Sequence, residues 1–237
     1  MKNIYEGTIS CKAILEANQR ECKCLYIDKK KRNKEFRYII NLAKSIQCPV
    51  HFMDRAEMEK LTTNKRFGGI LLEAKQKEKK KLKEAKGTLF YVDGVEDPYN
   101  LGSLCRSLYA AGIDGLILPE RDWSESEVTI LKASAGAYEK LPIYWIHDEA
   151  DLITFLKENQ IPLYCAYRSE AKSLYEIQFP KDVCVAIGGA LRGLSAKVLN
   201  HSNQNILIPY GRDFRNALDT PSASAITAFE ILRQKSE

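Results

Sequence analysis

Short apolar runs recur through residues 88–237, and each has the length of a buried β-strand. The runs are 89–92 (LFYV), 115–118 (GLIL), 163–166 (LYCA), 183–187 (VCVAI) and 205–208 (NILI). Segments with a helical pattern lie between and after them, notably at 101–111, 124–138, 148–159 and 221–235. This alternation predicts a parallel α/β sheet of at least five strands.

The first 73 residues alternate in the same way, with shorter elements. Helices are expected at 10–17, 36–45 and 55–61, and strands at 24–27, 49–52 and 68–72. The pattern predicts a small α/β domain over residues 1–73, with crossover connections.

A lysine-rich segment follows this small domain. Residues 75–86 (KQKEKKKLKEAK) contain seven lysines and one large apolar side chain. Such a composition buries too little apolar surface to form a core, and repulsion between lysines opposes a helix. We therefore predict a linker at 74–87, between a domain of residues 1–73 and a domain of residues 88–237.

Charge is distributed unevenly along the chain, whose net charge is +5. Residues 1–87 hold 22 Lys and Arg against 11 Asp and Glu, whereas residues 88–237 hold 14 against 20. A basic segment joined to an acidic one indicates a module for a polyanion such as nucleic acid. Lysine runs also occur for solubility alone, so charge leaves both interpretations open.

Bulk composition is that of a globular protein, with 45% hydrophobic and 28% charged residues. No apolar run approaches the roughly 20 residues that span a bilayer, and the start of the chain (MKNIYE) lacks the apolar stretch of a signal peptide. We expect a soluble, cytoplasmic protein that has no membrane segment. The seven cysteines are scattered and only three histidines exist, so we expect reduced thiols and no metal site.

Residues 97–107 (DPYNLGSLCRS) follow a predicted strand and enter a predicted helix. Pro98 disfavours helical backbone at Asp97, and Asn100 is a residue type that caps helices. Arg106, further along the helix, would grip a phosphate or carboxylate if directed at the strand ends. Taken by itself, the segment favours the simpler interpretation, an arginine on the solvent-facing surface of the helix.

Residues 185–195 (VAIGGALRGLS) have the pattern of a strand, a Gly-Gly turn and a helix start. Open α/β sheets bind ligands at such turns, beyond the carboxyl ends of their strands. The glycines at 188, 189 and 193 lack the G-x-G-x-x-G spacing, and no P-loop lysine follows. A nucleotide-binding oxidoreductase is therefore the least favoured function.

Residues 208–223 (IPYGRDFRNALDTPSA) run from the end of a strand through a polar loop into the last helix. Asp219 and Thr220 are expected to cap this helix, with Pro221 in its first turn. Small residues follow, and they permit close packing against another segment of the chain.

Taken in this order, the three blocks resemble motifs 1, 2 and 3 of the SpoU/TrmH family of RNA ribose methyltransferases, within the SPOUT superfamily. Residues 7–17 (GTISCKAILEA) and Gly69-Ile70 resemble more loosely the family's substrate-binding domain. The resemblance implies an α/β fold: a C-terminal parallel-sheet SPOUT domain with a deep trefoil knot, plus a small N-terminal L30e-like domain. It also implies S-adenosyl-L-methionine as cofactor, a homodimer, and methylation of the ribose 2′-hydroxyl of structured rRNA or tRNA.

The resemblance assigns roles to residues position by position. It makes Asn100 and Arg106 catalytic, with Arg106 assisting removal of the proton from the 2′-hydroxyl. The positions that it implies for the cofactor are Gly188, Gly193, Ile208, Leu218 and Asp219. The basic side chains that we expect to bind RNA are Lys79, Lys80, Lys81, Arg192, Arg212 and Arg215.

Two departures from the family pattern bear on activity. Ala190 stands where motif 2 usually has glutamate, and Asp219 stands where motif 3 usually has asparagine. Asp219 is expected to attract the sulfonium or to pair with a nearby arginine. We favour retained activity because the cofactor contacts rest mainly on backbone groups. The alternative is a catalytically silent RNA-binding protein that keeps the fold.

Overall fold

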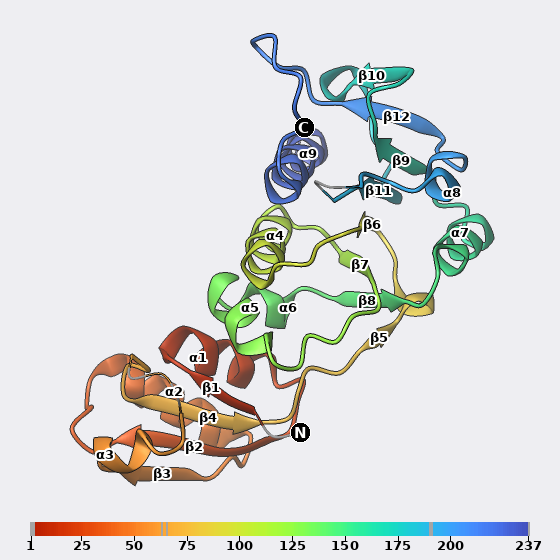
Figure 1. The fold of residues 1–237 in the computed structure, drawn as a ribbon. Helices are drawn as coiled ribbons and strands as arrows, with labels where there is room; N and C mark the ends of the chain where they lie inside the picture. Colours follow the sequence, from red (N-terminus) through yellow and green to blue (C-terminus); the bar gives the residue numbers. More distant parts are fainter. Residues whose placement is uncertain (1–2, 63, 65, 190–191, 237) are drawn as a thin grey trace. The chain divides into compact units, whose positions relative to one another are not determined.

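A computed structural model describes residues 3–62, 64, 66–189 and 192–236. The chain divides into two compact units (Figure 1). Unit 1 consists of Met1–Glu78 and Trp123–Lys140, and unit 2 consists of Lys79–Asp122 and Leu141–Glu237. Residues 123–140, which follow two strands of the predicted C-terminal domain, are thus part of the compact N-terminal unit.

Unit 1 contains a mixed sheet, which among the described residues has four strands. Their order is β1 (Asn3–Glu6), β4 (Ile70–Ala74), β2 (Cys22–Asp28) and β3 (Val50–Met53). β4 is antiparallel to both β1 and β2, whereas β2 and β3 are parallel. The expected small α/β domain is therefore present, with one strand, β1, that the sequence pattern did not indicate.

The helices of unit 1 come from both of its chain segments. They are α1 (Thr8–Ala17), α2 (Lys34–Ser45), α3 (Arg55–Met58), α5 (Glu127–Ala133) and α6 (Ala137–Lys140). The single helix predicted over 124–138 is wrong, because Ala135 and Gly136 take positive φ values of 51° and 86° and break it. A Cβ on Gly136 would lie 2.6 Å from the Cβ of Ala13, so glycine permits close packing of this turn on α1.

A buried polar network joins the two segments of unit 1. Arg20 is fully buried and donates from Nε to Oε1 of Glu139 at 3.1 Å, while its Nη2 contacts the other oxygen of the same carboxylate. Its Nη1 donates to the Tyr5 hydroxyl at 2.6 Å and lies 3.2 Å from Oε1 of Glu127. Burial lowers the pKa of Arg20, but Glu139 and Glu127 outweigh it and the net pKa is raised. The guanidinium therefore stays charged and paired.

Unit 2 is built on a parallel sheet, in which the described residues form eight strands. Their order is β10 (Ala171–Ser173), β12 (Gln204–Leu207), β9 (Leu163–Ala166), β11 (Val183–Ile187), β6 (Thr88–Val92), β7 (Gly115–Pro119), β8 (Ile143–Ile146) and β5 (Lys80–Lys81). All pairings between them are parallel. The prediction of a parallel sheet of at least five strands is confirmed.

The central strands β6 and β11 are buried along their whole length, as their continuous apolar sequences predict. The helices around them are α4 (Pro98–Ala110), α7 (Glu149–Glu158), α8 (Ala196–Leu199) and α9 (Thr220–Lys235). α4 packs against α9, which lies beside it in Figure 1. Short 3-10 turns, η1 (Leu82–Glu84) and η2 (Leu174–Glu176), precede β6 and β11.

The lysine-rich segment takes part in the fold of unit 2. Lys80 and Lys81 form the edge strand β5, which pairs with Tyr144 and Trp145 of β8. Leu82 packs against the main hydrophobic cluster of unit 2, and Ala85 is 7% exposed. The expectation that no core residue lies here is wrong, because one leucine and one alanine suffice once an edge strand holds the backbone.

Candidate active site

A pocket of about 610 Å³ opens at the carboxyl ends of β9, β11 and β12. Its lining combines the turn after β11 with the polar loop after β12. It brings together six of the predicted site residues: Gly188, Gly193, Ile208, Leu218, Arg212 and Arg215. This is the edge of a parallel sheet at which α/β proteins bind ligands.

Glycines shape one wall of the pocket because backbone packs directly on backbone there. A Cβ on Gly188 would lie 2.3 Å from the carbonyl carbon of Gly193, and one on Gly189 would lie 2.9 Å from the carbonyl oxygen of Gly94. Gly193 also donates its N–H to the Gly189 carbonyl at 2.9 Å. Any side chain at 188 would displace the turn. Ala190, where the family glutamate is missing, lies outside the described residues.

The opposite wall is the loop between β12 and α9. Leu218 donates its N–H to the Tyr210 hydroxyl at 3.1 Å. Arg168, two residues after β9, donates to the carbonyls of Arg215 and Asn216 at 2.7 and 2.9 Å. Sequence motifs did not indicate Arg168 or Tyr210. The position of Arg168 just past a predicted strand was the one available signal, since side chains there face the ligand edge of a sheet.

Asp219 has the capping role that the sequence predicted. Its carboxylate accepts the N–H of Ser222 at 2.7 Å and caps α9, as the sequence predicted for this helix start. Its side chain is exposed and does not line the pocket. Within the described part of the chain it forms no ion pair, so the expected pairing with an arginine is not seen. The neighbouring Thr220 donates to the Gly188 carbonyl at 3.2 Å and ties α9 to the glycine turn.

The two predicted catalytic residues lie on α4, outside the pocket lining. Asn100 and Arg106 are both exposed, and Arg106 has no ion pair or hydrogen bond with the residues that the structure describes. Asp97, rather than Asn100, caps the helix by accepting the Asn100 N–H at 2.8 Å. α4 packs on α9, whose Ala223 and Thr227 border the pocket.

The basic residues predicted to bind RNA fall into two groups. Arg192, Arg212 and Arg215 are exposed, and the last two line the pocket. The lysines 79–81 lie at the far edge of the sheet, in or beside β5. Lys79 also stacks over the Trp145 ring, 5.5 Å from its centroid. The structure therefore does not bring the lysines to the pocket.

A smaller pocket, of about 280 Å³, lies at the carboxyl ends of β6, β7 and β8 and is acidic. Burial raises the pKa of Asp93, and the nearby Glu149 carboxylate raises it further. Glu149 accepts the Ser195 hydroxyl at 2.7 Å, which fixes the segment after the glycine turn. The Tyr91 hydroxyl is buried here and has no hydrogen-bond partner among the described residues.

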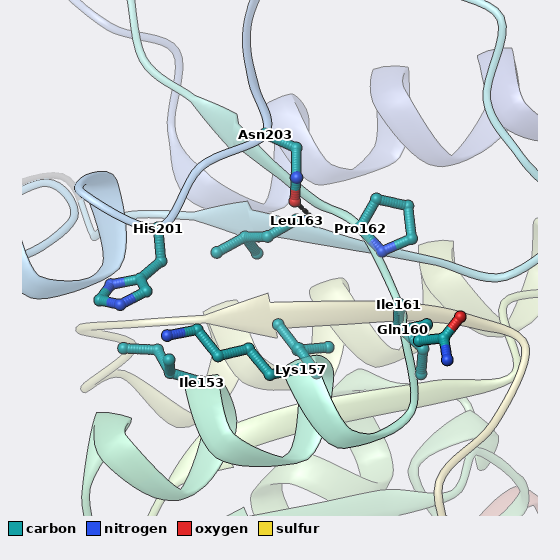
Figure 2. A pocket seen from close by; sticks show the side chains of 9 residues that line it. Ile153, Lys157, Gln160, Ile161, Pro162, Leu163, His201 and Asn203 are labelled. Carbon is teal, nitrogen blue, oxygen red and sulfur yellow. Dashed lines mark hydrogen bonds between the residues drawn. The ribbon is translucent and has the colours of Figure 1, made fainter.

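A third pocket, of about 250 Å³, lies near the C-terminal end of α7 and the start of β9 (Figure 2). Ile153 and Lys157 reach it from α7, and Asn203 accepts the Leu163 N–H at 2.8 Å beside it. It lies at the amino end of β9, whereas the glycine turn follows the carboxyl end of β11. It is lined by none of the predicted site residues.

Other classes of site have little support in the described residues. No group of three or more His, Cys, Asp or Glu among them is arranged to hold a metal ion. Nor is any helix of the described chain long and apolar enough to cross a bilayer. No disulfide joins the cysteines of the described chain.

Comparison with known proteins identifies the family. The model of the SpoU rRNA Methylase family matches residues 87–229, and the model described as RNA 2′-O ribose methyltransferase substrate binding matches residues 4–80. The chain therefore belongs to the SpoU rRNA methylase family, as the three sequence blocks indicated.

Two related proteins illustrate the level of sequence similarity. A protein of Staphylococcus aureus (strain MSSA476), named for the TrmH family of tRNA/rRNA methyltransferases, is 31% identical over 155 residues, 65% of this chain and 62% of the relative. The 23S rRNA (guanosine-2′-O-)-methyltransferase RlmB of Xanthomonas campestris pv. campestris is 29% identical over 152 residues, 64% of this chain and 61% of the relative. The chain thus matches less than two thirds of the length of these relatives.

Solved structures share the fold over nearly the whole chain. An RNA 2′-O ribose methyltransferase has a TM-score of 0.78 at 20% identity, with 100% of this chain and 90% of that chain covered. The SpoU methyltransferase AviRb from Streptomyces viridochromogenes, in complex with AdoMet, has a TM-score of 0.81 at 16% identity, with 100% and 91% covered. The predicted α/β fold, with a parallel-sheet domain and a small N-terminal domain, is confirmed.

Proposed function

We propose that this protein transfers a methyl group from S-adenosyl-L-methionine to a ribose 2′-hydroxyl of structured RNA, either rRNA or tRNA. The observation that carries the proposal is the pocket at the carboxyl ends of β9, β11 and β12, in a chain of the SpoU family. The names of the relatives, which include a 23S rRNA 2′-O-methyltransferase, support the same reaction.

The residues of the pocket fit the proposed cofactor. About 610 Å³ is within the range of small-molecule sites, and Ile187, Ile206 and Ile208 supply apolar surface for an adenosine. Gly188 and Leu218 both line the pocket, and their backbone groups are proposed to supply polar contacts. The sulfonium of the bound cofactor supplies an electrophilic methyl group, so the protein's task is mainly to hold two reactants in line.

The nucleophile in this reaction is a weak one. A ribose hydroxyl attacks well only if its proton leaves or its developing oxyanion is stabilised, and a guanidinium can do the second. Arg106 is the proposed group, because it is a cation with no competing partner among the described residues, on a helix that packs against the pocket's border. Asn100, which is earlier on the same helix and also exposed, is proposed to assist it.

A homodimer is part of the proposal. α4 and α9 pack side by side and expose three aromatic rings, with Tyr99 67%, Tyr109 45% and Phe229 48% accessible. Pairing of two copies across these helices would bury the rings and enclose Arg106. Mass measurement in solution tests the dimer, and Phe229→Asp should convert it to a monomer.

The deep trefoil knot is likewise proposed from the family. Its support is the crowding of two distant segments on the glycine turn. Gly189 packs on Gly94, and Thr220 donates to the Gly188 carbonyl.

RNA binding is assigned to the basic side chains of both units. The match of residues 4–80 to a substrate-binding family supports a role for unit 1. Arg192, Arg212 and Arg215 would contact phosphates near the pocket, and Lys79, Lys80 and Lys81 more distant ones. Affinity should then fall steeply with salt, since each phosphate contact releases a counterion.

The alternative is a catalytically silent RNA-binding protein. Two observations favour it: Asn100 and Arg106 do not line the pocket, and Asp219 is used as a helix cap. Cofactor binding without methyl transfer to any RNA would establish this alternative.

The experiment that tests the leading proposal compares wild type with Arg106→Ala. We expect calorimetric titration to give the same affinity for S-adenosylmethionine within about twofold, and methyl transfer to fall by at least about 100-fold. The matched control is Ser103→Ala, an exposed position on the same helix, which should change neither. Unchanged turnover in Arg106→Ala would refute the catalytic role of Arg106.

A further inference from the structure

We propose that Arg168 is a positioning residue, which keeps the loop 209–219 in the conformation that forms the cofactor pocket. Tyr210 contacts both Arg168 and the Leu218 amide and so links the two. The identity of the ligand rests on the proposed function. The contacts of Arg168 and Tyr210 with the loop are observed in the structure and do not depend on that function.

The Arg168 side chain binds backbone carbonyls of the loop. One terminal nitrogen donates to the Arg215 carbonyl at 2.7 Å and the other to the Asn216 carbonyl at 2.9 Å. Two parallel bonds to successive carbonyls need the planar fork of a guanidinium, which an ammonium does not have. The described residues place no carboxylate in an ion pair with Arg168, so its charge is directed at these carbonyls.

Tyr210 connects Arg168 to the end of the loop. The Arg168 guanidinium lies over the Tyr210 ring, 5.3 Å from its centroid, and Phe214 packs on the same ring at 6.0 Å. The Tyr210 hydroxyl accepts the Leu218 N–H at 3.1 Å. The Leu218 backbone is one of the groups proposed to hold the cofactor, so the fixed ring also fixes a binding group.

The loop has few other means of keeping its shape. Residues 209–219 form neither helix nor strand, and residues 211–217 are exposed. Apolar burial therefore contributes little there, and segments of this kind open readily. A ligand that needs one loop conformation binds more weakly in proportion to the fraction of molecules that have it. Arg168 and Tyr210 would raise that fraction before the ligand arrives.

The first test needs no ligand. Amide hydrogen exchange is measured for wild type, Arg168→Lys, Tyr210→Phe and the control Lys172→Ala, which removes an exposed cation from the neighbouring strand β10. We expect exchange of the Leu218 amide, which donates to the Tyr210 hydroxyl, to speed up about 10-fold in Arg168→Lys and at least as much in Tyr210→Phe, which removes the acceptor. Amides elsewhere, and those of the control, should not change. Unchanged exchange of the Leu218 amide in Arg168→Lys would overturn the proposal.

The second test separates positioning from direct contact. Calorimetry measures the affinity of each variant for S-adenosylhomocysteine and for 5′-methylthioadenosine, which lacks the amino-acid carboxylate. A positioning residue should weaken both by the same factor, about 10-fold, raise the KM for S-adenosylmethionine and leave kcat nearly unchanged. Weakening of S-adenosylhomocysteine alone would show that Arg168 touches the ligand's carboxylate, and the positioning role would be wrong.

The two tests also separate this inference from the proposed function. If wild type bound neither nucleoside, the proposed cofactor would be wrong, and the exchange experiment would still decide whether Arg168 holds the loop. A double variant adds a check, because Arg168→Gln and Tyr210→Phe act on one assembly and their effects on exchange should be less than additive. Strict additivity would contradict a shared assembly.

Discussion

The two units of this protein use their charged side chains in opposite ways. In unit 1, Arg20 and Glu139 are fully buried and pair with each other across two segments of the chain. In unit 2, Arg106, Arg212 and Arg215 are exposed, and Arg212 and Arg215 line the pocket. The buried pair of unit 1 is committed to structure, whereas the exposed arginines of unit 2 remain available to a ligand.

The difference has a clear physical consequence. A buried ion has lost its water, so removal of its partner leaves an uncompensated charge, whereas an exposed ion is solvated with or without a partner. Substitutions of charged residues should therefore affect stability in unit 1 and function in unit 2. The two tryptophans allow this to be measured separately, because Trp123 belongs to unit 1 and Trp145 to unit 2.

The largest effect is expected for Arg20→Ala. Loss of the guanidinium leaves Glu139 and Glu127 buried without a cation, which should lower the free energy of unfolding of unit 1 by about 3–5 kcal/mol. Urea unfolding followed by Trp123 fluorescence, in a Trp145→Phe background, measures it. The control is Lys29→Ala, whose ion pair with Asp54 is exposed and should contribute less than about 1 kcal/mol. Equal effects of the two variants would refute the physical basis of the contrast, which is that burial of an ion pair sets the cost of losing it.

The next effect tests the backbone wall of the pocket. Gly188→Ala places a Cβ 2.3 Å from the Gly193 backbone, which cannot yield as a side chain would. We expect a loss of about 1–3 kcal/mol in unit 2, read from Trp145, together with loss of S-adenosylmethionine binding. Gly211→Ala is the matched control, since its Cβ would meet nothing within 4 Å. Retained binding in Gly188→Ala would show that the turn is not part of the site.

The smallest effect is a difference in pH dependence between two carboxylates. Burial raises the pKa of Glu6 in unit 1, but bonds from Lys132, Thr62 and Asn64 outweigh it, and the net pKa is lowered. The contribution of Glu6 to the free energy of unfolding is therefore present above the ordinary pKa of 4.5 and is lost as pH falls below it. Asp93 in unit 2 has a raised pKa, so it weakens the fold at neutral pH, and this cost disappears as pH falls toward 3.8.

Urea unfolding between pH 7 and 3.5 tests both signs. At pH 7 we expect Glu6→Gln to lose about 1–2 kcal/mol in unit 1 and Asp93→Asn to gain up to about 1 kcal/mol in unit 2. Both differences from wild type should shrink in acid. A destabilised Asp93→Asn at pH 7 would mean that the charged form of Asp93 supports the fold.

Much of the fold of unit 2 was predictable, because its strands are continuous apolar runs between helices. The strands β8 (IYWI) and β10 (AKS) were missed. AKS holds no large apolar residue, whereas IYWI is a continuous apolar run like those that predicted the other strands. The break at Ala135 and Gly136 was missed because the apolar pattern continues through it. The pairing of Arg20 with Glu139, 119 positions apart, leaves no local pattern to detect.

The candidate site was predictable to the extent that backbone geometry constrains residue type. Gly188 and Gly193 stand where a side chain would clash or where φ is positive, and Gly, Pro and small residues are visible in a sequence. Arg168 was not predictable, because its contacts are with carbonyls 47 and 48 positions away, which any residue type provides. The capping of α9 by Asp219 was predictable because aspartate before Thr-Pro is a typical helix start, whereas its role toward a cofactor stays a prediction.

The most direct test of the central claim is transfer of tritium from methyl-labelled S-adenosylmethionine to RNA, followed by alkaline hydrolysis of the product. A 2′-O-methyl group blocks cleavage of the adjacent phosphodiester, so the account predicts label in alkali-resistant dinucleotides. Label in mononucleotides would place the methyl group on a base and contradict ribose methylation. Cofactor binding with no label in any RNA, precursor rRNA and tRNA included, would instead establish the silent RNA-binding protein.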